Sequence, residues 1–343
     1  MKDEVVTKPA EDPTPAAAAP RPAPAPWMRS RWGNVDVYNL WPIAVIILVI
    51  VITSFRSNTY FSVVNFKNVL SQMSVYGIVT MGECILLISA GIDLSVGANM
   101  AFSSICTGLL FTQGGYPMWL CIAAGIGAAI GVGLINGILA SLNRAHPFII
   151  TLGMQVFLYG LATQMTGSAP VNNMGWLYSA FGGYLPSDPP FFGLPTVAMP
   201  FIVVVICAYA FLRWSPVGRR AYAIGGNEEA AYLSGIPVRR TKIILYAIMG
   251  LLAGIAAMVL AGNIDEASFN LAQNYELIGI AMAVVGGTAL FGGRGGALRS
   301  LQGVVLYAVV ANAIVFLGFT SNYQQMALGI IIVIAVMVTR AQR

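Results

Sequence analysis

Long apolar runs separated by short polar segments make up most of the sequence from about residue 40 onward. A helix that crosses a membrane needs about 20 mostly apolar residues, with roughly 17 to 25 tolerated. The pattern therefore predicts an all-α fold, a polytopic membrane bundle of about ten transmembrane helices. They are expected at Leu40–Phe55, Val69–Ser89, Leu94–Phe111, Met118–Leu142, Phe148–Met165, Thr196–Leu212, Ile243–Ala261, Tyr275–Phe291, Leu298–Leu317 and Tyr323–Thr339.

Composition agrees with a chain that lives in a lipid membrane. Hydrophobic residues are 57% of the sequence, charged residues 9%, and the mean hydropathy is +0.77. Soluble domains carry about 25% charged residues, so a water-soluble fold is excluded. The net charge is +5, but the basic residues are scattered between apolar runs, and no nucleic-acid partner is expected.

The distribution of Lys and Arg sets the orientation, because cytoplasmic connections collect these residues. With ten spans and both termini cytoplasmic, every Lys and Arg except Arg56 and Lys67 falls on the cytoplasmic side. The stretch 213–242 alone holds six of the eighteen. A count wrong by one span would move this cluster to the outer face.

Two domains follow. Residues 1–36 end in an Ala/Pro-rich run and are predicted to be a disordered cytoplasmic tail, and residues 37–343 form the transmembrane domain. Within that domain, 213–242 is a cytoplasmic loop and 166–195 an external loop. The external loop has no Lys or Arg but several aromatic residues, which suits either an anchor at the lipid headgroups or a surface for an external protein.

A short helix is predicted inside the cytoplasmic loop, at about Glu228 to Ser234. Asn227 is a good N-cap, Glu228 and Glu229 suit the first turn, and Gly235 suits the left-handed position that ends the helix. Seven residues are too few for a helix that stands alone in water. It therefore packs on its own membrane domain or docks into a soluble partner.

The sequence lacks the motifs for ATP hydrolysis, metal binding and catalysis. No GxxxxGK[ST] motif occurs, so this chain is not expected to hydrolyse ATP. The four cysteines have no CxxC spacing and His146 is the one histidine, so no metal, cofactor or catalytic residue is expected. The glycine cluster Gly286 to Gly296 is interpreted as a tightly packed turn and not as a phosphate cradle. Glycines four apart, as in Gly127/Gly131, Gly133/Gly137 and Gly250/Gly254, favour close helix packing.

Four segments together resemble the permease subunit of ribose-type monosaccharide ABC transporters. They are GIDLSVGA (91–98), AIGGNEEAAYLSGI (223–236), VVGGTALFGGRG (284–295) and Tyr323-Gln324. The resemblance covers about residues 40 to 340. It implies a bacterial inner-membrane permease that forms a homodimer, with separate ATP-binding subunits below and an external sugar-binding protein above. It also implies that the 227–235 helix couples to the ATPase. Helical spacing of three and four residues then places Ala230, Leu233 and Ser234 on one contact face.

The translocation path is less defined by sequence. Neutral polar residues suit an uncharged sugar, but each can equally tie two helices together. Two acids, Glu83 and Asp93, fall in the membrane zone, and they leave open an ion-coupled carrier or channel for a small polar solute. Asp93 can instead cap the helix that is expected to start at Leu94. The candidate path residues are Gln72, Glu83, Asp93, Asn99, Gln155 and Asn312. Which sugar is carried does not follow from the sequence.

Overall fold

The structure is a computed structural model that describes residues 41–142, 146–181, 183, 193–320, 322–324, 326–327 and 329–330. The expected N-terminal tail, part of the external loop and most of the expected tenth span lie outside these residues. The described elements are α1 (Trp41–Arg56), α2 (Val63–Ile88), α3 (Val96–Thr112), α4 (Met118–Leu142), α5 (Pro147–Thr166), β1 (Val171–Asn172), α6 (Trp176–Phe181), α7 (Ala198–Trp214), α8 (Pro216–Gly226), α9 (Glu228–Leu233), α10 (Val238–Ile264), β2 (Glu266–Ala267), α11 (Tyr275–Val285) and α12 (Ala297–Phe316).

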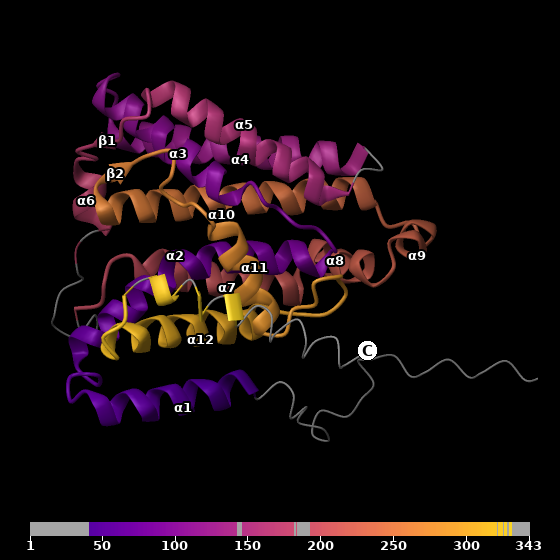
Figure 1. The fold of residues 1–343 in the computed structure, drawn as a ribbon. Coiled ribbons are helices and arrows are strands. Elements are labelled where there is room, and N and C mark those ends of the chain that lie inside the picture. The colour runs from indigo at the N-terminus through magenta and orange to yellow at the C-terminus, as the bar shows by residue number, and fades with distance from the viewer. Residues whose placement is uncertain are drawn as a thin grey trace, which may run out of the picture. The chain divides into compact units, whose positions relative to one another are not determined.

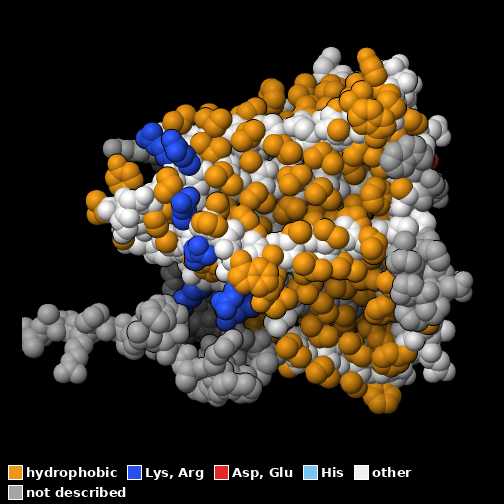
Figure 2. Space-filling model, turned by 180° about the vertical axis from the view of Figure 1, so that it is seen from behind, with side chains coloured by type: hydrophobic (Ala, Val, Ile, Leu, Met, Phe, Trp, Pro, Cys, Tyr) orange, Lys and Arg blue, Asp and Glu red, His pale blue; other side chains and the backbone are white. Residues whose placement is uncertain are grey.

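The long helices run side by side, as Figure 1 shows. At one end, which we call the strand end, lie α6 and the antiparallel pair β1–β2, in which Val171 pairs with Ala267. At the other, which we call the α9 end, lie α8 and α9. Figure 2 shows one face that is mostly hydrophobic between these ends, with Lys and Arg gathered toward the α9 end. This is the distribution that the positive-inside rule predicts for a membrane bundle.

The all-helical fold class is confirmed, whereas the count of ten spans stays a prediction. Among the described residues, α2, α4, α5, α10 and α12 are long and apolar enough to cross a membrane, and α7 with α8 forms a pair bent by 71°. The apolar helices α1, α3 and α11 are shorter. The expected span Tyr275–Phe291 is wrong in length: α11 ends at Val285, because Gly286 and Gly287 follow and Gly287 adopts φ of 101°.

A polar cap outside the apolar run moves the start of one predicted helix and begins another helix that the apolar pattern did not predict. The second span begins at Val63 and not at Val69, because the Ser62 side chain accepts a hydrogen bond from the Asn65 backbone N–H. The loop 213–242, predicted to be cytoplasmic, is mostly helical: Ser215 caps α8 and Pro216 occupies its first turn. Apolar length alone finds the buried part of a helix and misses its polar first turns.

Glycine contacts determine how closely α4 and α10 pack. A methyl group at Gly133 would overlap the Tyr246 carbonyl oxygen, and one at Gly250 would overlap the Ala129 carbonyl oxygen. The two backbones therefore touch where lipid offers no hydrophobic drive for association. By contrast, a methyl group at Gly127 or Gly131 would meet no atom within 4 Å. The predicted role of small residues in packing is confirmed for the 133 and 250 pairs and is wrong for the 127/131 pair.

This contrast gives a first prediction. Gly250→Val should sharply reduce the yield of monodisperse protein from membranes, because a side chain there must push α4 away from α10, and overpacking typically costs about 1 to 3 kcal/mol or more. Gly127→Val, with the same change in an open position of α4, should leave the yield near that of the wild type. Size-exclusion chromatography of a fluorescent fusion measures both. Equal yields from the two variants would contradict the assigned packing.

Candidate functional site

The short helix α9 is built as its caps predict. The Asn227 Oδ1 atom accepts a hydrogen bond of 2.9 Å from the Ala230 N–H, and Glu228 and Glu229 occupy the first turn. The helix ends at Leu233, one residue earlier than expected. Gly235 then has φ of 80°, a left-handed conformation that few side chains tolerate. The start of the predicted helix is confirmed and its end is corrected by one residue, because Ser234 is the C-cap.

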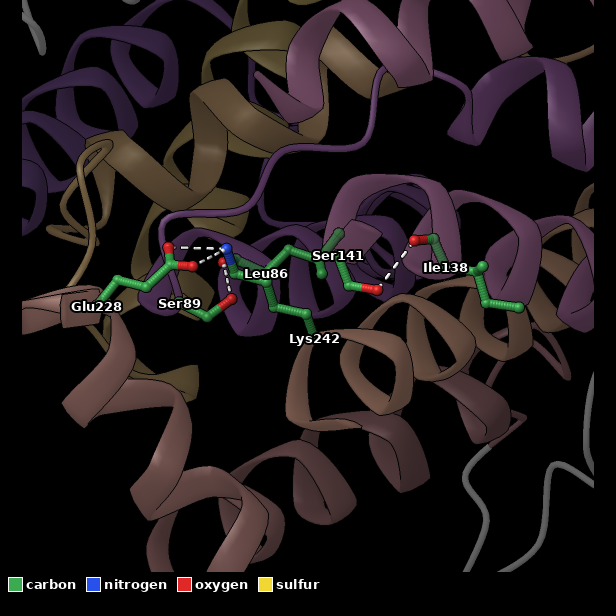
Figure 3. A network of polar contacts seen from close by, with 6 residues as sticks. All are labelled: Leu86, Ser89, Ile138, Ser141, Glu228 and Lys242. Atoms are coloured by element: carbon green, nitrogen blue, oxygen red, sulfur yellow. Dashed lines mark hydrogen bonds and ion pairs between the residues drawn. The ribbon is translucent and has the colours of Figure 1, made fainter. Parts of the chain in front are cut away.

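Two contacts hold α9 on the membrane domain. Ala231 is buried against Ile224, Ile236 and Val238, in a small apolar cluster separate from the main core. Lys242, the fifth residue of α10, places its Nζ atom 2.7 Å from both carboxylate oxygens of Glu228 (Figure 3). A helix of six residues is fixed by these contacts and by its caps, since it is far too short to be stable alone.

The other residues of α9 are exposed to solvent. Tyr232 and Leu233 are 69% and 78% exposed, and Ala230 and Ser234 are exposed as well. A surface groove of about 900 Å³ adjoins the helix and is lined by His146, Glu229, Tyr232 and Arg239, among others. Two large apolar side chains on an otherwise charged surface, beside a groove, are typical of a protein-binding surface. Tyr232 was not among the residues that the sequence selected for this face.

Glycines connect α8 to the last turn of α2 and to the turn after α11. The Gly293 N–H donates to the Ile88 carbonyl oxygen at 2.9 Å, and a methyl group at Gly225 would overlap that same oxygen. Tyr222 of α8 also donates to the Gly295 carbonyl oxygen at 3.0 Å. The predicted packing role of the 286–296 glycine cluster is confirmed. Through these contacts the glycine cluster packs α8, and with it α9, directly against the end of α2.

A break between α2 and α3, residues 91–95, follows this junction. Its backbone is satisfied by side chains from other helices: Thr151 of α5 accepts from the Leu94 N–H at 3.1 Å, and the Tyr246 hydroxyl of α10 donates to the Ile92 carbonyl at 2.9 Å. Buried backbone groups need such partners, because none come from water or lipid. The break is thus a built feature of the bundle.

Asp93 shapes this break, although its expected role as the cap of a helix starting at Leu94 is wrong. The helix α3 begins at Val96, and the Asp93 Oδ1 atom accepts from the Ser95 N–H at 2.9 Å and from the Ser95 hydroxyl at 2.6 Å. Asn136 of α4 then donates to the Ser95 hydroxyl oxygen at 2.8 Å. Because the carboxylate accepts hydrogen bonds within a turn at residues 93–95, α3 starts two residues later than the predicted Leu94.

Two more buried acids lie near the break. Glu276, in the first turn of α11, accepts from Gln155 Nε2 at 2.7 Å, and its other oxygen lies against Gly97 of α3. Glu83 is fully buried beside Gly279, one turn further along α11, and neither of its oxygens has a hydrogen-bond partner among the described residues. Within that part of the chain, no group of three or more His, Cys, Asp or Glu side chains is arranged to hold a metal ion.

The neutral path candidates take different places. Asn99 is 1% exposed and donates to the Ala129 carbonyl oxygen of α4 at 3.1 Å, and Asn312 exchanges hydrogen bonds with Asn65 of α2. Both act as ties between helices in this structure. Gln155 binds Glu276, and Gln72 is half-buried on α2. Glu83, Asp93 and Gln155 are therefore brought together around the break, whereas Gln72 and Asn312 are not part of that cluster.

Sequence reasoning missed several residues of this cluster. Thr151, Tyr246 and Asn136 lie within long apolar runs, where a single polar residue has no periodic pattern that would mark it. Glu276 was detectable, because an acid in a membrane span is rare and generally faces the bundle interior. It was passed over because it stands at the very start of the predicted eighth span.

A family model for the permease component of branched-chain amino acid transport systems matches residues 65–336 of this chain. The chain belongs to this permease family. Its relatives include the ribose import permease of Bacillus subtilis strain 168, which is 35% identical over 304 residues, 88% of this chain and 92% of the relative. The ribose import permease of Escherichia coli K12 is 33% identical over 86% of this chain and 91% of its own. The galactose/methyl galactoside import permease of Haemophilus influenzae is 30% identical over 85% and 91%.

Membership in this permease family confirms the resemblance found from four short segments. The family match spans α2 to α12, so it includes both the break after α2 and the exposed helix α9. A permease is a transport subunit that is embedded in the membrane. The apolar helices described above are consistent with that placement.

A second prediction concerns Asp93 and separates a structural acid from one that binds an ion. Asp93→Ala removes the two hydrogen bonds from Ser95 to the carboxylate and the longer ones from Asn136, at 3.4 Å. It should lower the apparent melting temperature by about 5 °C, from a loss of about 2 kcal/mol. Asp93→Asn keeps an oxygen for Ser95 and should remain close to the wild type in melting temperature and in transport. Differential scanning fluorimetry in detergent and uptake assays measure these outcomes. The ion-coupled carrier would be supported instead if transport by the wild type requires an ion gradient and transport by Asp93→Asn does not.

Proposed function

We propose that this chain is the transmembrane permease subunit of a binding-protein-dependent ABC importer that carries a monosaccharide, such as ribose or a related sugar, across the cell inner membrane. ATP is hydrolysed by a separate subunit. The relatives named above are sugar import permeases, which supports the substrate class. The observation that carries the coupling role is α9, a capped helix of six residues that exposes Tyr232 and Leu233 to solvent.

An ATP-binding subunit is the partner that we assign to α9. The helix is held at one buried alanine and one ion pair, so most of its surface is free to contact a second protein. The groove beside it is lined by residues from the start of α5, from α9 and from the start of α10, which offers the partner a concave seat. The glycine junction then gives a direct mechanical route from α9 through α8 to the break after α2.

The assembly has two permease copies, an external sugar-binding protein at the strand end and ATP-binding subunits at the α9 end. Ten passes with both termini cytoplasmic fit the alternation of the described elements: α2, α4 and α7 end toward α8 and α9, while α3, α5 and α10 end toward β1, β2 and α6. The positively charged α9 end is cytoplasmic in this arrangement.

Cysteine labelling tests this orientation. In a variant whose native cysteines are replaced, Asn173→Cys beside β1 should react with a membrane-impermeant maleimide in intact cells. Gly226→Cys at the end of α8 should react only after the membrane is permeabilised, because it lies on the cytoplasmic face. Both positions are exposed, so access differs only by side. Labelling of Gly226→Cys in intact cells would overturn the proposed orientation.

The coupling role is tested on Leu233. Leu233→Asp should leave the amount of permease in the membrane unchanged, since the side chain is 78% exposed, yet reduce sugar-stimulated ATP hydrolysis by the assembled transporter more than tenfold. A charge at the centre of an apolar contact surface weakens docking. Leu233→Met, which keeps an apolar side chain of similar volume, should retain most of the stimulation. Equal stimulation in Leu233→Asp and the wild type would return α9 to a purely structural role.

A further inference from the structure

A hollow of about 550 Å³ lies beside α5, in the half of the bundle nearer the strand end. One wall is α5, and the other is the non-helical segment 268–274 that connects β2 to α11. The described residues that line it carry no charge, and they combine aromatic rings, hydroxyls and carboxamides. They include Tyr159, Thr163 and Gln164 of α5 and Phe269, Asn270 and Gln273 of the connecting segment.

The connecting segment descends deep into the bundle. It leaves the strand pair at Ala267, opposite Val171, and by Ala272 its carbonyl oxygen lies against Gly97 in the first turn of α3. At the other end of α3, a methyl group at Gly108 would lie 3.0 Å from the Val171 side chain. Gly97 and Gly108 are eleven residues apart on one helix, which corresponds to about 16 Å. The segment thus reaches roughly that far inward from the strand end.

Exposed polar groups at this depth need water or protein around them. Asn270, Gln273 and Asn274 are all exposed, in a stretch with turns instead of a regular helix. Irregular backbone at membrane depth is tolerated only where it is buried in protein or lines a water-filled cavity. The Tyr159 hydroxyl oxygen is buried and has no hydrogen-bond partner among the described residues. This part of the surface is therefore not made for lipid.

The outward face of α5 changes character along its length. Toward the α9 end, Ile149, Leu152 and Val156 are exposed and apolar. One to two turns further toward the strand end, the same side of the helix carries Gly160 and Gln164, both exposed. A helix that faced lipid throughout would be apolar along both halves. The polar half coincides with the hollow.

We propose that this hollow is a contact site for the neutral sugar in the outer half of the membrane. This proposal rests on the proposed sugar-import function and assigns residues of the hollow to substrate binding. Hydroxyl groups of a sugar both donate and accept, so they can pair with the carboxamides of Gln164 and Gln273 and with the unpartnered hydroxyl of Tyr159. The Phe269 ring offers an apolar surface for the C–H face of the sugar. The second permease copy would shield the open side of the hollow from lipid.

The lining sets the chemical class of the ligand. A site for an anionic or cationic solute would need a charged partner, because a charge inside the membrane is expensive without one. The described lining has only neutral groups. Gln155 lies one turn inward of Tyr159 on α5 and binds Glu276, so the hollow leads toward the buried cluster at the break. A sugar that entered here would meet neutral amides before any acid.

Transport stoichiometry tests the site. The transporter is reconstituted in proteoliposomes with its ATP-binding subunit and saturating loaded binding protein, and the probe is D-ribose or D-galactose, whichever the wild type imports. Gln273→Leu and Gln164→Leu should each lower the sugar delivered per ATP hydrolysed about two- to tenfold, the worth of one neutral hydrogen bond. Stimulation of ATP hydrolysis by the loaded binding protein should persist. Val156→Leu, on the same face of α5 but outside the hollow, should match the wild type.

Water access supplies a second, independent measurement. In a variant without native cysteines, Gln273→Cys should react with a small hydrophilic thiol reagent, and excess sugar should slow the reaction. Val156→Cys, which is 68% exposed in one copy but lies on the apolar half of α5, should react far more slowly. Wild-type delivery per ATP in both Leu variants, or an unreactive Gln273→Cys, overturns the site. If neither sugar stimulates the wild-type transporter, the sugar-import function fails instead, and the cysteine reaction still decides whether the hollow holds water.

Discussion

The need to satisfy every buried backbone group is the constraint on which this structure depends. Most of the chain meets it with helices, since lipid offers no partner for a free N–H or C=O. The break at residues 91–95 cannot, and it relies on Thr151 from α5 and Tyr246 from α10. Two helices are thereby tied to one irregular segment. Asp93, Ser95 and Asn136 extend the same network to α4. A movement of the break must move these helices or exchange their hydrogen bonds.

Close glycine contacts link that network to the α9 end of the bundle. Gly225 and Gly293 bring α8 and the turn after α11 against the Ile88 carbonyl, only a few residues before the break. Backbone in direct contact transmits displacement without the slack of long side chains, because packed interiors are stiff. The helix α9 is joined to α8 through Asn227 and the small cluster around Ala231. A partner that pulls on α9 therefore acts on the end of α2 through few intermediate contacts.

Local chemistry made some of these features predictable. The start of α9 followed from Asn227 and its end, to within one residue, from Gly235. The helix α4 followed from apolar length over Met118–Leu142. Each depends on residues near in sequence. The positions of Glu276 against Gly97 and of Asn99 against Ala129 depend on which helices become neighbours. A single sequence does not show which helices are neighbours or how they are aligned. It therefore does not determine whether a polar residue links two helices or faces the translocation path. The length of α11 failed for a related reason: Gly286 and Gly287 continue an apolar run without continuing the helix.

The separation of neutral from acidic groups fits the task of moving an uncharged solute. Glu83, Asp93 and Glu276 are all buried, at 0%, 1% and 3% exposure, and two of them are engaged by Ser95, Asn136 or Gln155. The hollow beside α5 is lined instead by amides, hydroxyls and aromatic rings. Neutral groups bind a sugar through several modest hydrogen bonds, each worth about 1 kcal/mol, so that it can leave as readily as it enters. A carboxylate in that position would accept hydrogen bonds from the sugar hydroxyls about twice as strongly as an amide, which would slow the release of the sugar. Asp93 and Glu276 are instead engaged by Ser95 and Gln155, at or beside the break of residues 91–95.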